Sequence, residues 1–448
     1  MKNNKNAKKS SADRRNGRRD FCKSSALVTG ALILPAMHMN AMVNVANDKK
    51  LKIALVGCGG RGTGAASHAL HADPNVELVA MADAFEDRLQ ESLLNLQKEF
   101  PGTQRINVPK KNQFVGFDGA NKAMDLADVI ILATPPGFRP EHFEYAVNTG
   151  KHVFMEKPVA TDVPGVRKVL AAAKVAREKK LNVVVGLQRH YQDNYLIGLK
   201  HIKDNAIGKI VSGQVYWNSS GVWVRERQPG QSELEYQMRN WYYFNWLCGD
   251  HILEQHIHNI DVANWFIGEY PVSAQGMGGR QVRTGKDHGE IFDHHFVEYT
   301  YPSGAVIASQ CRHMPETMSR GSETFQGSKG TIETYGDNTF IKDLNGGEIF
   351  THRGKDDPNP YQVEHIKLFE SIRNKGVISD AENGAMSTMS AIIGRMATYS
   401  GQVIKWDEAM GSNIDLAPDN LTWDSPAPVQ PNADGYYNIP IPGKTVVI

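Results

Sequence analysis

The sequence predicts two successive folded domains, an α/β domain with a parallel sheet and then an α+β domain with an open, largely antiparallel sheet. Apolar runs of strand length alternate with helical stretches over the first part of the chain. In the second part strands outnumber helices and the alternation is lost. The 448 residues allow more than one domain, and 41% hydrophobic with 22% charged residues exclude collagen-like, coiled-coil and largely disordered chains.

The first expected unit is a strand, a glycine-rich turn, a helix and a second strand. An apolar run at 51–57 leads into Gly57-Cys58-Gly59-Gly60-Arg61-Gly62, a helix is expected from 63 to about 71, and a second run at 76–82 ends at Asp83. Gly57 permits the tight turn, Gly59 lets the backbone approach a pyrophosphate, and Gly62 lets the helix pack close to the strand. In this context the pattern predicts a Rossmann dinucleotide-binding site.

Asp83 sets the expected cofactor. It follows Gly62 by 21 residues, where a carboxylate accepts hydrogen bonds from the ribose hydroxyls of the adenosine. The same carboxylate repels a 2′-phosphate, so NAD is favoured over NADP. Gly60 and Arg61 belong to the expected cofactor-binding turn.

Further strand and helix units complete the nucleotide domain, which we expect over residues 50–188. A strand at 127–132 ends in a loop that contains Thr134 and Pro135, at the sheet edge where open α/β proteins bind ligands. The remaining expected elements are a helix at 141–149, a strand at 151–155, a helix at 163–179 and a strand at 181–186.

The substrate domain is expected over residues 189–410, followed by an extended surface tail at 411–448 that is rich in Pro, Asn and Asp. Its expected strands lie at 209–218, 292–301, 305–311, 322–325 and 330–335. Its expected helices lie at 251–266 and 364–373.

Residues 1–46 are typical of a leader. Arg18-Arg19-Asp20-Phe21-Cys22-Lys23 matches a twin-arginine signal, and the apolar run at 26–36 that follows is too short to span a bilayer. We therefore expect export to the periplasm or cell envelope without a stable transmembrane span. Proteins exported by this route are generally folded beforehand, which favours a cofactor that is already bound.

Charge and cysteine content exclude other classes of protein. The first 25 residues hold nine Lys or Arg against two Asp, so the rest of the chain carries 41 basic and 47 acidic residues. A mildly acidic body has no general attraction to nucleic acid, and none is expected as a partner. Beyond the leader three cysteines remain, an odd number without framework spacing, so no disulfide network is expected.

Lys157 is the first candidate catalytic residue. It lies in Glu156-Lys157-Pro158, directly after an expected strand and at the edge where the nicotinamide belongs, and Glu156 is expected to line the same cofactor site. A lysine there can donate a hydrogen bond to a substrate oxygen and help a proton leave.

Glu254, His258 and Asp261 form the second candidate group. Their spacing places all three on one face of the expected helix at 251–266, where Glu254 could hold His258 as a general base. A solvated charged face remains an alternative. A zinc site built from His251, Glu254, His256 and His258 is another, but HExxH and CxxC are missing, so no metal is expected.

Aromatic and polar residues predict a carbohydrate cleft. Aromatic faces stack on sugar rings, and polar side chains bind hydroxyl groups. The candidates for substrate binding are Arg189, Tyr191, Trp223, Arg225, Tyr242 and Asp261. Gln188, which follows the last strand of the nucleotide domain, is expected to contact the cofactor.

These motifs resemble the Gfo/Idh/MocA family, which includes glucose-fructose oxidoreductase and inositol dehydrogenase. The resemblance spans about residues 50–410, including the segments at 325–331 and 399–407. It implies that Lys157 is catalytic. The family signature Asp-x-x-x-His-x-x-Asp reads Glu254, His258 and Asp261 here, so the first acid is one methylene longer.

The resemblance implies an NAD-dependent oxidoreductase that acts on a secondary hydroxyl of a sugar, cyclitol or glycoside. His258 would take the hydroxyl proton, Lys157 would orient the oxygen, and hydride would leave the carbinol carbon for the nicotinamide. The exported members suggest a tightly bound NAD, and we expect a homo-oligomer formed through the C-terminal sheet.

Two alternatives stay open. One is an NAD-dependent glycosidase of the family 109 type, which oxidises a sugar transiently, eliminates the aglycone and reduces the ring again; the Thr-His-Gly segment associated with that group is missing from this sequence. The other is a cofactor-binding sensor without turnover, which the presence of both Lys157 and His258 disfavours.

Overall fold

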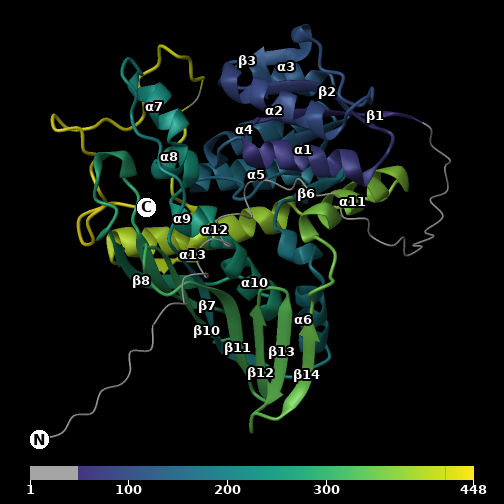
Figure 1. Ribbon diagram of the computed structural model, residues 1–448. Helices are drawn as coiled ribbons and strands as arrows, with labels where there is room; N and C mark the ends of the chain where they lie inside the picture. The colour runs from purple at the N-terminus through teal and green to yellow at the C-terminus, as the bar shows by residue number, and fades with distance from the viewer. Residues whose placement is uncertain (1–48, 419) are drawn as a thin grey trace, which may run out of the picture. The chain divides into compact units, whose positions relative to one another are not determined.

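The fold described here is that of a computed structural model, which describes residues 49–418 and 420–448. The expected leader and its twin-arginine signal lie outside the described residues. Figure 1 shows the nucleotide-binding part around β1 to β6 and the second sheet around β7 to β14.

The first sheet is parallel throughout, as predicted. Its strand order is β3-β2-β1-β4-β5-β6, the order of a doubly wound dinucleotide-binding sheet. The strands are β1 (Leu51–Val56), β2 (Val76–Asp83), β3 (Gln113–Val115), β4 (Val129–Leu132), β5 (His152–Met155) and β6 (Val183–Val185). The helices between them are α1 (Gly60–Ala72), α2 (Glu86–Glu99), α3 (Gly119–Asp125), α4 (Arg139–Asn148) and α5 (Val163–Glu178).

The glycine turn after β1 leaves no room for side chains at two positions. Gly57 has φ +95°, and a Cβ there would lie 2.5 Å from the carbonyl carbon of Ala133. A Cβ at Gly62 would lie 1.9 Å from the carbonyl oxygen of Gly57, which confirms that α1 packs against the turn. A Cβ at Gly59 or Gly60 would meet nothing within 4 Å, so the turn is open on that side.

The second sheet has nine strands in the order β14-β13-β12-β11-β7-β10-β9-β8-β15. Only the pairing of β10 with β7 is parallel, which confirms the largely antiparallel class. The strands are β7 (Ile210–Ser219), β8 (Ser273–Gly279), β9 (His294–Thr300), β10 (Val306–His313), β11 (Arg320–Gly327), β12 (Gly330–Tyr335), β13 (Asn338–Asp343), β14 (Glu348–Arg353) and β15 (Ile404–Lys405).

Two C-terminal helices connect the two sheets. α12 (Ala381–Ser400) is buried along almost its whole length and contacts α5 of the first domain as well as β8 and β9 of the second (Figure 1). α11 (Pro360–Arg373) packs on α1, and its Leu368 and Phe369 join the core of the nucleotide domain. Part of the expected substrate domain, α11 and α12, therefore packs against the first domain.

The prediction of a single helix at 251–266 is wrong. The structure divides it into α9 (His251–Glu254) and α10 (Ile257–Ile267). At the break the amide of His256 donates to the carbonyl of His251, one residue further back than in an α-helix. Glu254 and His258 therefore lie on different helices and do not share one helical face.

The C-terminal tail follows α13 (Trp406–Met410) and runs over the surface without further helices or strands in its described part. Arg167 donates to the carbonyls of Met410 and Ser412, and Gln237 donates to the carbonyl of Val429. The tail also places Trp423 against Phe85 of the nucleotide domain.

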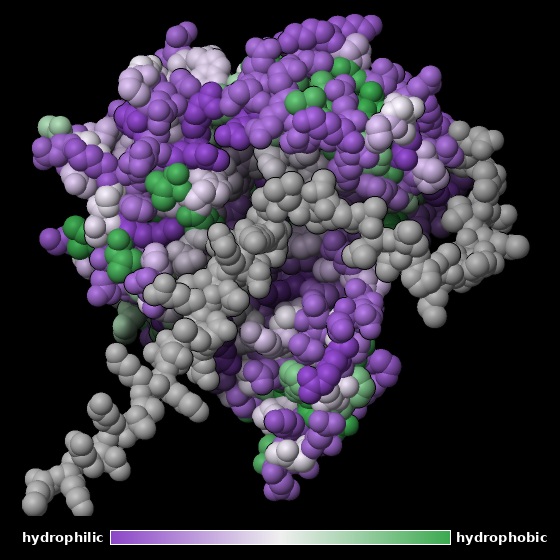
Figure 2. All heavy atoms as spheres, in the orientation of Figure 1, coloured by the Kyte–Doolittle hydropathy of each residue, from purple (hydrophilic) through white to green (hydrophobic). Residues whose placement is uncertain are grey.

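The remaining helices of the second domain are α6 (Asp193–Lys203), α7 (Glu233–Arg239) and α8 (Asn245–Cys248). None of the helices in the described ranges is long and apolar enough to cross a membrane. The face seen in Figure 2 is mostly hydrophilic, with small scattered apolar groups. Cys58, Cys248 and Cys311 are buried and free.

Gly62→Ala should destabilise the protein by about 1 to 3 kcal/mol, because the added methyl forces the turn and α1 apart. Gly64→Ala is the matched control. Its added methyl meets nothing within 4 Å inside the same helix, so it should stabilise by about 0.5 to 1 kcal/mol. Urea unfolding measures both, and equal effects would contradict the packing at Gly62.

Candidate functional site

A cavity of about 780 Å³ lies at the carboxyl ends of β1, β2 and β4. The glycine turn forms one wall through Gly57, Gly59, Gly60 and Gly62, and Thr134 and Pro135 continue it after β4. The structure thus brings most of the predicted cofactor-binding residues around one space.

Asp83 lies at the end of β2 and lines this cavity. Its carboxylate accepts hydrogen bonds from the amides of Cys58 at 2.7 Å and Phe85 at 2.9 Å. Burial raises the pKa of Asp83, and these two hydrogen bonds partly oppose the rise. The side chain is thereby fixed at the position where a ribose would present its hydroxyl groups.

Arg61 lines the cavity and forms an ion pair with Glu156, which is not among the lining residues although it was predicted to be one. The guanidinium also lies 3.0 Å from Glu364 and stacks over the ring of Tyr361 at 4.7 Å. Glu156, at the end of β5, is buried. Its contact with Arg61 fixes the segment that leads directly to Lys157.

The opposite wall of the cavity comes from the second domain. Trp223 and Arg225 line it, although both were predicted to bind substrate. Arg239 of α7 lies 3.1 Å from Asp87 of α2 and stacks at 4.0 Å over Phe85, and the ring of Trp423 in the tail lies 5.3 Å from that of Phe85. We call Phe85, Arg239 and Trp423 the outer clamp.

Lys157 meets Glu254 across the two domains. Its ammonium donates to the carbonyl of Glu254 and lies 3.4 Å from the Glu254 carboxylate. The two side chains are only 12% and 11% exposed, so the pair is shielded from water. Neither residue is among those that line the cavity.

The contact that we expected between Glu254 and His258 is replaced by this pair, because the helix break separates the two residues. Burial raises the pKa of Glu254 to about 7, and the positive charge of Lys157 limits the rise. Glu254 therefore changes its protonation state close to neutral pH.

His258 is the second residue of α10 and is buried. Burial, together with the positive charges of Lys157 and Arg189, holds its pKa well below the ordinary value. The imidazole is therefore neutral, and within the described chain its Nδ1 has no hydrogen-bond partner. A neutral imidazole can accept a proton or a hydrogen bond from a ligand.

Asp261 supports the site and is fully occupied by protein partners. It contacts His190 at 2.7 Å and accepts from Asn383 at 3.0 Å and Ser387 at 2.7 Å. Burial would raise its pKa, but His190 and these hydrogen bonds lower it. His190, which stacks on Trp265 at 3.9 Å, is a partner that the sequence did not reveal.

The remaining residues that were predicted to bind substrate or cofactor do not lie together in one site. Arg189 is buried in an ion pair with Glu323, and the hydroxyl of Tyr191 donates to Asp380 at 2.6 Å. Gln188 and Tyr242 are partly or fully buried, and Gln188 Oε1 and the Tyr242 hydroxyl lack a partner among the residues described.

A group of polar atoms without hydrogen-bond partners in the described chain lies near Tyr242, and the sequence did not predict it. His313 at the end of β10 stacks on Tyr242 at 5.9 Å and on His251 at 4.5 Å. Both ring nitrogens of His313, and both polar side-chain atoms of Asn218 on the neighbouring strand β7, are buried without a partner in the described chain. Buried polar groups are normally paired, so these atoms could accept or donate hydrogen bonds to a bound ligand or to water.

The cavity fits a dinucleotide. A backbone without Cβ atoms at Gly59 and Gly60, and a carboxylate at Asp83, are the features that such a ligand requires. The chain matches the family model "Oxidoreductase family, NAD-binding Rossmann fold" over residues 51–187 and the "GFO/IDH/MocA C-terminal domain" over residues 199–333. The chain therefore belongs to the Gfo/Idh/MocA family of oxidoreductases, and its cofactor is NAD.

Two curated relatives and one solved structure illustrate the similarity. Inositol 2-dehydrogenase of Rhizobium meliloti is 26% identical over 49% of this chain and 58% of the relative. A glycosyl hydrolase family 109 protein of Shewanella pealeana is 27% identical over 43% of this chain and 39% of the relative. The chain spans about half the length of the curated relatives it matches.

The solved structure shows the same fold. Scyllo-inositol dehydrogenase from Lactobacillus casei, determined with bound NAD(H) and scyllo-inositol, has a TM-score of 0.58 and 18% identity over 80% of this chain and 100% of that one. The predicted fold is therefore confirmed.

Arg189→Met should lower the free energy of unfolding by about 3 to 5 kcal/mol, because it leaves the buried carboxylate of Glu323 without its cation. Arg320→Met is the control, since half-buried Arg320 lies 3.9 Å from exposed Glu333, and it should cost no more than about 1 kcal/mol. Urea unfolding measures the free energy of unfolding of both variants. A stable Arg189 variant with weakened substrate binding would instead support the predicted role of Arg189 in substrate binding.

Proposed function

We propose that the protein is an NAD-dependent oxidoreductase that acts on a secondary hydroxyl of a sugar, cyclitol or glycoside. The observation that carries this proposal is the shielded pair of Lys157, which follows the end of β5, and Glu254, together with neutral His258, whose pKa the charge of Lys157 helps to lower. Inositol and sugar dehydrogenases among the relatives and similar structures support the substrate class.

Bound NAD supplies the hydride acceptor. Gly57, Gly59, Gly62 and Asp83, which line the cavity, would hold it. The ammonium of Lys157 donates a hydrogen bond to the substrate oxygen and stabilises the negative charge that develops there. Neutral His258 accepts the hydroxyl proton. Glu254 orients Lys157, because both its carbonyl and its carboxylate face the ammonium.

A second candidate function is glycoside cleavage through transient oxidation, which the family 109 relatives favour. Incubation of the purified protein with a panel of glycosides, followed by mass spectrometry, separates the two. A product that has lost the mass of two hydrogen atoms supports the dehydrogenase, and release of free sugar supports the glycosidase. If no glycoside or cyclitol gives either product, both proposed activities are contradicted and a sensor without turnover is favoured.

Retention of NAD is part of the proposal. The outer clamp joins three separate parts of the chain, α2, α7 and the tail, over the end of the cavity where Asp83 lies. Separation of these contacts would ease the release of a dinucleotide held there. Retention also suits an exported protein, since free NAD is scarce outside the cytoplasm.

We further propose export by the twin-arginine route and association through the second sheet. Met277 and Phe296 are exposed partners on β8 and β9. Such apolar side chains on an open sheet face suit a contact with a second copy. Cell fractionation and light scattering test the two proposals, and a cytoplasmic or a monomeric protein would overturn them respectively.

Lys157→Met and His258→Ala should each lower turnover by about 10²- to 10⁴-fold, because positioned acid-base groups contribute that much. NAD binding should survive both changes, since neither residue lines the cavity. Steady-state kinetics and bound-nucleotide content are the measurements. Near-normal turnover in either variant would remove that residue from the mechanism.

The ratio kcat/KM should decline toward acid pH with a midpoint near the raised pKa of Glu254, about 7, because protonation removes the anion that holds Lys157. His258 does not titrate in this range, since its pKa lies well below the ordinary value. Glu254→Gln should therefore be slower at alkaline pH and lack the acidic decline. A decline that persists unchanged in Glu254→Gln would assign it to another group.

Protein purified without added nucleotide should release about one NAD(H) per chain on heat denaturation, assayed in the supernatant. Arg239→Ala should lose nucleotide faster during dialysis, because it removes the contacts with Asp87 and Phe85. Arg320→Ala is the control and should retain the nucleotide, because Arg320 does not line the cavity. A wild-type protein that is empty and works only with added NAD would contradict retention.

A further inference from the structure

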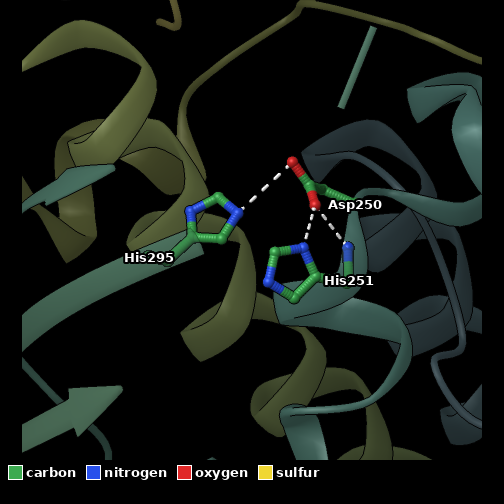
Figure 3. A group of neighbouring side chains, drawn as sticks. All are labelled: Asp250, His251 and His295. Atoms are coloured by element: carbon green, nitrogen blue, oxygen red, sulfur yellow. Dashed lines mark hydrogen bonds and ion pairs between the residues drawn. The ribbon is translucent and has the colours of Figure 1, made fainter. Parts of the chain in front are cut away.

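Asp250, His251 and His295 form a buried cluster separate from the cofactor cavity (Figure 3). Asp250 precedes α9, His251 is its first residue, and His295 lies on β9. Each offers one ligand atom, and these atoms all lie within 4.8 Å of one another. None of the three side chains is exposed to solvent. The proposed hydride transfer uses none of them.

The spacing of the cluster suits a metal ion. Asp250 Oδ1 lies 2.8 Å from His251 Nδ1, and Asp250 Oδ2 lies 3.3 Å from His295 Nε2. Ligand atoms at about 2.0 to 2.1 Å from a tetrahedral ion are about 3.3 Å apart, so only small shifts are needed. Two imidazoles and one carboxylate are ligands that first-row divalent transition metals prefer.

The hydrogen bonds around His295 leave a lone pair facing a carboxylate. The hydroxyl of Thr398 donates its one proton to the carbonyl of Arg395, at 3.0 Å. The same oxygen lies 2.9 Å from His295 Nδ1, so Nδ1 is the donor in that contact. In a neutral ring Nε2 is then unprotonated and points at Asp250, with no hydrogen-bond partner in the described chain. A cation between the two groups resolves this repulsion.

Other contacts hold the cluster rigidly. Asp250 also accepts from the amides of His251 and Phe292 and from the hydroxyl of Tyr399 at 2.5 Å. Its backbone has φ +74° and ψ 162°, a conformation that a non-glycine residue adopts only where the surroundings impose it. Next to the cluster, His313 stacks at 4.5 Å on His251 with both ring nitrogens buried and unpartnered in the part of the chain described.

We propose that Asp250, His251 and His295 bind a divalent first-row transition metal ion, with Zn²⁺ as the probe. The ion would fix the start of α9, the four-residue helix that ends at Glu254. Its role would be to position the partner of Lys157, and it would take no part in hydride transfer. The proposal is independent of the substrate and of NAD.

The first test uses the wild-type full chain without a histidine tag. After chelation and dialysis, Zn²⁺ should bind at about one ion per chain by elemental analysis and should raise the Tm. Co²⁺ should give the visible absorption of a site with nitrogen ligands. No stoichiometric binding, no shift in Tm and no Co²⁺ spectrum would overturn the proposal.

The second test compares two histidine variants. His295→Gln should weaken Zn²⁺ binding by more than the about 10- to 100-fold that loss of an outer partner costs. His352→Gln is the matched control, because His352 is also paired with a carboxylate, Asp357 at 2.7 Å, outside the cluster. Equal Zn²⁺ affinity in the wild type and both variants would place the metal elsewhere. If His295→Gln does not fold, the wild-type measurements still decide.

Discussion

The buried contact between Lys157 and Glu254 is the interaction on which the rest of the structure depends. It joins the end of a strand in the nucleotide domain to a short helix of the second domain, and water scarcely reaches it. A charged pair removed from water is costly unless its geometry is closely held. Much of the surrounding architecture can be understood as holding that geometry.

On the nucleotide side, Arg61 binds Glu156 and so fixes the residue before Lys157 to the glycine turn. On the other side, Asp250 fixes the start of α9, and α12 packs between the two domains. The dinucleotide turn and the acid-base pair are therefore mechanically connected, although the acid-base pair does not line the cofactor cavity.

The nucleotide domain could be predicted because its fold follows from local patterns. Each buried strand is a short apolar run, and the glycine turn has steric requirements that few sequences meet. Much of the second domain could not be predicted in the same way. α12 is surrounded by other elements, so its small and polar residues show no amphipathic face. The strands β13 and β14 are mixed in polarity and were missed for a similar reason.

The candidate site, too, could be predicted only in part. Lys157 and Glu254 were selected from their motifs, and the structure brings them together. The pairing of Glu254 with His258 was wrong because the break after Glu254 has no sequence signal such as proline or glycine; the residues there are Gln255 and His256. Arg189 was assigned to a ligand because a buried partner distant in sequence, Glu323, cannot be inferred from one sequence.

The most direct test of the account is rapid mixing of the purified, nucleotide-containing protein with an oxidisable sugar or cyclitol while the absorbance of reduced nicotinamide is followed. The account predicts that reduced nicotinamide appears on the protein within one turnover, and that Lys157→Met slows its appearance by at least about 100-fold. Product that forms at the wild-type rate without any reduction of the bound nucleotide would contradict it.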